Sequence, residues 1–145
     1  MHALGGTWRY WGAEAALAGG DLAAARGWAD EAVSSTTGYY LSAALTGRAR
    51  VLMAQGEPKQ AESDAHDALT RAANIEAYLF VPDILEVLAD LAGETGSHRE
   101  AARLFGAAYA IRQRIGLSQL NAPIYGGCVR SSFDNRFRDS TKPTL

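Results

Sequence analysis

The chain has 145 residues, which is enough for one domain with a hydrophobic core and too few for two of ordinary size. Hydrophobic residues make up 48% of the chain and charged residues 21%, a balance that excludes a largely disordered protein. The formal net charge of −2 provides no general attraction to nucleic acid, because nucleic-acid-binding domains usually carry a basic surplus.

Three further features of the composition narrow the class of protein. The 28 alanines favour closely packed helices, and the single cysteine, Cys128, excludes an internal disulfide. No apolar run reaches the roughly 18 residues of a membrane span. The first residues, from Met1, lack the charged and apolar segments of a secretory signal. We therefore expect a cytoplasmic, alanine-rich helical protein without membrane contact.

The sequence predicts six helices, and local signals mark where they begin and end. In chain order they span residues 7–19, 22–34, 39–55, 58–73, 81–95 and 98–115. Asp21 can cap the second helix, and Pro58 takes the first helical position of the fourth, where its missing N–H is harmless. We expect Pro82 to set the first turn of the fifth helix, and Ser97 and Glu100 to form a capping box before the sixth.

A frame of glycines and alanines repeats along these helices. Gly20, Gly56 and Gly96 each end one helix and precede the next, at offsets of 36 and 40 residues. Five, nine and twelve residues after each glycine, one helix face carries Ala25, Ala29 and Ala32, then Ala61, Ala65 and Ala68, then Ala101, Phe105 and Ala108. A period of this size with two helices per unit is typical of an α-solenoid.

We therefore expect an all-α fold, a solenoid of about three antiparallel helix pairs followed by a partial C-terminal helix. The repeat units would span about residues 7–36, 39–75 and 77–116. Residues 117–145 would form a partial fourth unit or a capping helix with a frayed tail. Helical apolar spacing continues there, but Pro123 and the pair Gly126 and Gly127 weaken the start of a helix.

The repeat resembles the tetratricopeptide (TPR) motif in a degenerate form. The small residue of that motif's first helix is matched by Ala13, Ala49 and Ala89. The alanines seven apart, such as Ala25 and Ala32, match its second helix. The motif's tryptophan position holds Arg9, Leu45 and Leu85 instead, and its closing proline is missing from all three units.

Longer strings resemble the helical-repeat region of large actinobacterial, mycobacterial-type LuxR-family transcriptional regulators with ATPase modules. The strings are GGDLAAAR at 19–26, QGEP at 55–58 and GSHREAARLFGAA at 96–108, and the resemblance covers about residues 10–116. A G-x-x-x-x-G-K-[ST] phosphate loop is missing, and no room follows Leu145 for a C-terminal helix-turn-helix, so we expect a truncated relative or a fragment. The resemblance implies a non-catalytic protein-interaction module in transcription regulation and signal transduction.

The sequence offers no catalytic or metal-binding constellation, so we expect neither an enzyme nor a cofactor. Glu62 and His66 share one helix face and could hold a metal, but two ligands make a poor site and a solvated ion pair explains them. His98 lies within the predicted capping box. There is no G-x-S-x-G nucleophile elbow, and Cys128 has no histidine partner in the sequence pattern.

Two groups of residues could contact partners outside the repeat. The first-unit aromatic residues either fill the core or, on the uncovered face of a terminal repeat, pack against a preceding repeat or a second copy; they are Trp8, Tyr10, Trp11, Trp28, Tyr39 and Tyr40. A weak basic surplus comes from Arg130, Arg136, Arg138 and Lys142 against Asp134 and Asp139. Solvent exposure explains this surplus, and the alternative function is weak, non-specific and salt-sensitive nucleic-acid binding.

The resemblance to TPR domains implies a partner-binding groove, because in those domains the first helix of each unit lines a concave surface. When the chain is aligned to those domains by its repeated alanines, the groove positions hold Tyr10, Glu14, Thr46, Arg50, Asp83, Glu86 and Asp90. Apart from the tyrosine, four of the five chargeable groups are acidic, so we expect a basic or amphipathic protein segment as partner. The alternative is that these residues are only the solvated faces of amphipathic helices.

Overall fold

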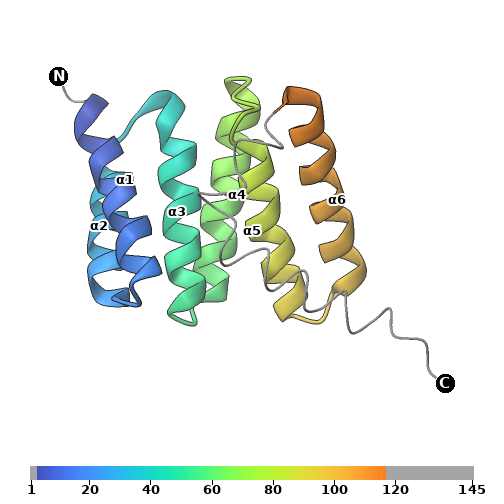
Figure 1. Ribbon diagram of the computed structural model, residues 1–145, viewed down its shortest axis with the longest axis horizontal. Helices are drawn as coiled ribbons and strands as arrows, with labels where there is room; N and C mark the ends of the chain where they lie inside the picture. The colour runs from blue at the N-terminus through green and yellow to red at the C-terminus, as the bar shows by residue number, and fades with distance from the viewer. Residues whose placement is uncertain (1–2, 117–145) are drawn as a thin grey trace. The chain divides into compact units, whose positions relative to one another are not determined.

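Six α-helices and one short 3₁₀ helix form the regular structure of residues 3–116, the part of the chain that the computed structural model describes (Figure 1). They are α1 (Ala3–Ala18), α2 (Leu22–Ser35), η1 (Gly38–Tyr40), α3 (Leu41–Ala54), α4 (Pro58–Asn74), α5 (Val81–Glu94) and α6 (His98–Ile115). Residues 3–116 contain no β-strand, so the prediction of an all-α protein is confirmed for them. The predicted partial helix within 117–145 lies outside the described residues.

Five of the six helices agree with the predicted boundaries to within two residues at each end, and the first does not. α1 begins at Ala3 instead of residue 7, so that Gly5 and Gly6 lie inside it. Glycine disfavours a helix by only about 1 kcal/mol per residue and keeps its backbone donor, so two glycines do not prevent the first turns. Residues 39 and 40, predicted as the start of the third helix, belong to the 3₁₀ helix Gly38–Tyr40, which directly precedes α3.

The frame glycines Gly20, Gly56 and Gly96 close three helices in the same way. Their φ angles are +80°, +77° and +83°, a left-handed conformation that glycine adopts without a steric penalty. The N–H of each donates to the carbonyl three residues earlier, and the next N–H donates to the carbonyl five residues before it. These two bonds define a Schellman motif and satisfy carbonyls that the helix end leaves open. The prediction that each of these glycines ends a helix is confirmed.

The predicted helix starts depend on local capping, and three of them are confirmed. The Asp21 side chain accepts a hydrogen bond of 3.0 Å from the N–H of Ala24. Pro58 and Pro82 lie in the first turns of α4 and α5. The capping box at 97–100 stays a prediction.

Small residues form most of the core at the positions that the frame predicts. Eight of its nine positions are buried, at Ala25, Ala29, Ala32, Ala61, Ala65, Ala68, Ala101 and Ala108. Phe105 is partly buried, and the small residues of the first helices, Ala13, Ala49 and Ala89, are buried. Because alanine adds little bulk and loses no rotamer freedom, helices can approach closely along this face.

Consecutive helices from α1 to α5 also contact each other in space. α1 contacts α2 and α3 contacts α4, while α2 and α4 also contact the helix that follows (Figure 1). The first helices touch as well, α1 with α3 and α3 with α5. The largest buried cluster joins α3, α4 and α5, and a smaller one joins Ala13, Ala25, Ala29 and Val51. These contacts lie within one compact unit, Met1–Ile111, and the division into repeat units at 7–36, 39–75 and 77–116 stays a prediction.

Candidate partner-binding face

The predicted groove residues of α1 and α3 contact each other across the space between these helices. A Cβ atom on Gly47 would lie 3.0 Å from Cε2 of Tyr10, so the tyrosine ring rests on α3 where a side chain is missing. One turn further along, Nη1 of Arg50 donates to Oε1 of Glu14 at 3.2 Å, and about four-fifths of both side chains is buried. This part of the predicted face therefore also holds α1 on α3.

Arg50 is the positive centre of this face. Burial alone would lower the pKa of Arg50, but the carboxylates of Glu14 and Asp83, together with the hydroxyl of Tyr10, outweigh it, and the pKa lies above its ordinary value. The guanidinium is therefore permanently charged. It connects groove residues of α1, α3 and α5, which the sequence predicted to share one face.

Thr46 lies deeper than a groove residue should. Its side chain is 3% exposed, and its hydroxyl donates a 2.7 Å hydrogen bond to the carbonyl of Ser42 one turn earlier. The cause is that α3 contacts α1, α2, α4 and α5, which leaves little of its surface free. Thr46 accordingly presents no polar group to solvent.

The acidic part of the predicted face lies on α5. Asp83, Glu86 and Asp90 are half-buried and follow one another at spacings of three and four residues, which places them on one side of the helix. Their role in binding a partner stays a prediction. Of the seven predicted residues, these three carboxylates and Glu14 supply the negative charge, and Arg50 offsets one of them.

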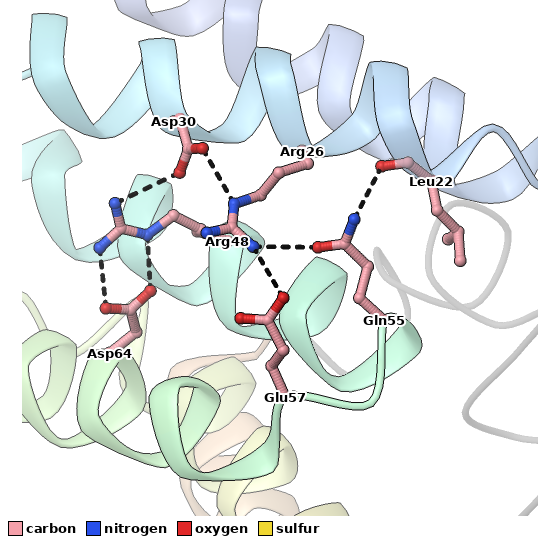
Figure 2. Close-up of polar contacts among 7 residues, drawn as sticks. All are labelled: Leu22, Arg26, Asp30, Arg48, Gln55, Glu57 and Asp64. Atoms are coloured by element: carbon pink, nitrogen blue, oxygen red, sulfur yellow. Dashed lines mark hydrogen bonds and ion pairs between the residues drawn. The ribbon is translucent and has the colours of Figure 1, made fainter.

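A second polar network, which the sequence did not predict, joins α2 to α3 and α4 (Figure 2). Asp30 accepts from Nε of Arg26 at 2.9 Å and from Nη1 of Arg48 at 3.5 Å. Nη1 of Arg26 also donates to Gln55 at 3.0 Å and to Glu57 at 3.4 Å. The network therefore connects the helices on both sides of the η1 segment through four charged side chains and the amide of Gln55.

The strongest pair of this network joins α3 to α4. Nε and Nη2 of Arg48 donate to the two carboxylate oxygens of Asp64 at 2.7 and 2.9 Å, a bidentate geometry (Figure 2). Hydrogen bonding to Asp64 raises the pKa of Arg48 above its ordinary value, against the opposing effect of burial. Asp64 is 7% exposed, so the pair lies largely out of water.

A signal in the sequence could have found this pair. Two helices joined by a frame glycine are called a helix pair below. Eight residues before and eight residues after the frame glycine, the three helix pairs carry Gly12 and Trp28, Arg48 and Asp64, and Leu88 and Leu104. A Cβ on Gly12 would lie 3.0 Å from the Trp28 ring, and Leu104 packs against the cluster that contains Leu88. In each helix pair, the two residues at these positions therefore complement each other: in size in the first, in charge in the second and in apolar character in the third.

The aromatic residues of the first unit lie mostly at the surface. Trp8 is 76% exposed and Trp11 47%, although the Trp11 ring also meets Tyr10 edge-on with centroids 5.4 Å apart. Trp28, Tyr39 and Tyr40 are exposed as well, and the Tyr39 ring lies 4.9 Å from that of Phe80. Because most of these rings are exposed, they do not fill the core. The other alternative, contact with a preceding repeat or a second copy, stays a prediction.

The remaining predicted features give no further site within residues 3–116. Glu62 and His66 lie 3.9 Å apart on one exposed helix face, as predicted for an ion pair. No three His, Cys, Asp or Glu side chains of these residues cluster as metal ligands would. None of the described helices is long and apolar enough to cross a membrane. Cys128 and the basic residues Arg130, Arg136, Arg138 and Lys142 lie outside the described residues.

The chain is similar to part of two mycobacterial proteins named for transcription regulation. Over 102 residues, 70% of this chain, it is 54% identical to the "Putative HTH-type transcriptional regulator" Rv0890c of Mycobacterium tuberculosis and to its namesake Mb0914c of Mycobacterium bovis. The chain spans 12% of the length of these curated relatives. No family model matches the chain, and no solved structure matches it. The predicted relationship to transcription regulators is confirmed.

Proposed function

We propose that residues 3–116 form a TPR-like α-solenoid of three antiparallel helix pairs. Three observations support the proposal: the identical Schellman ends at Gly20, Gly56 and Gly96, the burial of alanine at equivalent positions, and the contacts between consecutive helices from α1 to α5. Each helix pair then buries its apolar face only against the adjacent pairs, as repeat architectures do.

The chain then acts as a non-catalytic interaction module in a LuxR-type transcriptional regulator system. The observation that carries this proposal is the 54% identity to the mycobacterial regulators over 70% of the chain. Because the chain spans 12% of their length, their activities as whole proteins are not transferred to it. What this part contributes is a protein-binding surface.

That surface is the side of the first helices α1, α3 and α5, and its net charge is acidic. Its seven predicted positions hold four carboxylates, those of Glu14, Asp83, Glu86 and Asp90, and a single guanidinium, that of Arg50. Three carboxylates on one helix side attract a basic or amphipathic segment and steer its approach. The partner expected from this chemistry is a protein segment with lysine or arginine on one face and apolar residues on the other.

Titration of the full chain with a labelled synthetic peptide tests the proposal. An amphipathic Lys/Leu peptide should bind, and a Glu/Leu peptide of the same length and apolar pattern should not. Reversing Glu86 and Asp90 together to lysine should weaken the Lys/Leu complex at least roughly tenfold, since two attractive charge contacts become repulsive. The double variant should keep the helical circular dichroism spectrum of wild type.

The matched control reverses two exposed acidic residues of α4, Glu62 and Asp67, to lysine. It changes the net charge of the chain by the same amount away from the proposed surface, so peptide binding should stay within roughly twofold. Equal loss in both double variants would refute the α5 surface. A gel shift with duplex DNA that weakens as salt rises, with no peptide binding, would favour nucleic-acid binding instead.

A further inference from the structure

We draw no further inference here: the strongest candidate, the surface patch that the exposed rings of Tyr39 and Tyr40 in η1 form with Phe80 just before α5, carries nothing because nothing in the structure shows what covers it.

Discussion

α4 ends with the same two backbone hydrogen bonds as α1, α3 and α5, but its left-handed residue is a glutamate instead of a glycine. At the end of α4, Glu76 donates to the carbonyl of Ala73 at 3.3 Å and Ala77 donates to that of Ala72 at 2.8 Å. These are the same two bonds that close α1, α3 and α5 at their glycines. Glu76 has a φ of +55°, and no other non-glycine residue of the described chain has a positive φ. A Cβ in this conformation costs about 1–2 kcal/mol.

Glu76→Gly is expected to stabilise the protein. Glycine removes the left-handed strain but gains freedom in the unfolded chain, which takes back about 0.5–1 kcal/mol. The free energy of unfolding should therefore rise by about 0.5–1 kcal/mol, measured by urea denaturation. The opposite control is Gly96→Ala, which places a Cβ at a φ of +83° and should lower stability by about 1 kcal/mol. Destabilisation by Glu76→Gly would show that the glutamate side chain has a role of its own.

Ala61 tests the tightness of the alanine frame at a single position. It has no exposed surface and lies in the core cluster, where α3 contacts α4. Ala61→Leu should overpack this contact and lower the free energy of unfolding by about 1–3 kcal/mol. Gln60→Leu, at the exposed neighbouring position, should change it by less than about 0.5 kcal/mol. Equal thermal melts for the two variants would mean that the frame does not mark the close contact.

At the scale of the helices, the sequence predicted what depends on short-range chemistry. Gly20 and Pro58 act through φ and a missing N–H within one turn, so the ends of most helices were predictable. The start of α1 was not, because the weak cost of two glycines did not overcome helix formation around them. The pairing of Arg48 with Asp64 was also missed, since it joins two helices and depends on how they pack.

The candidate face shows the same difference between features that short-range spacing predicts and features that depend on how the helices pack. Tyr10 and Glu14 lie on one side of α1 because their spacing follows the helix period, and they contact α3 at Gly47 and Arg50. The burial of Thr46 was not predictable from that spacing. It depends on how many neighbours α3 acquires, and a central helix loses surface that the first helix keeps. Exposure of Trp8 has the opposite cause, since no helix pair of the described chain precedes α1.

The two residues that lie eight positions before and eight positions after the frame glycine should tolerate a change from an ion pair to an apolar pair, provided that both are replaced together. Asp64→Leu alone leaves Arg48 largely buried without its bidentate partner and should lower the free energy of unfolding by about 2–3 kcal/mol. Adding Arg48→Leu installs the pair found at Leu88 and Leu104, and should restore stability to within about 1 kcal/mol of wild type. A double-mutant cycle by urea denaturation measures the coupling. Additive losses in the double variant would show that the two positions are independent.

At the scale of the whole chain, stability in a stack of helix pairs is the sum of each pair and its contacts with its neighbours. The first pair holds to the second through the polar contacts of Glu14 with Arg50, Arg26 with Gln55 and Glu57, and Asp30 with Arg48. It also does so through Tyr10 on Gly47 and through the small cluster of Val51 with Ala13, Ala25 and Ala29. The largest buried cluster, by contrast, lies in α3, α4 and α5. Weakening the contacts between the first and second helix pairs should therefore unfold α1 and α2 locally before the remaining helices.

Gly47→Leu tests this coupling, because its side chain would occupy the space of the Tyr10 ring, which lies 3.0 Å from the Cβ position. Amide hydrogen exchange should accelerate at least roughly tenfold in α2, while α4 keeps its protection. Gly27→Leu, on α2, has nothing within 4 Å of its Cβ position, so it should leave both helices as protected as in wild type. An equal loss of protection in α2 and α4 would mean that the described helices unfold as one cooperative unit, and the contacts at Gly47 would then stabilise the whole stack rather than its first pair.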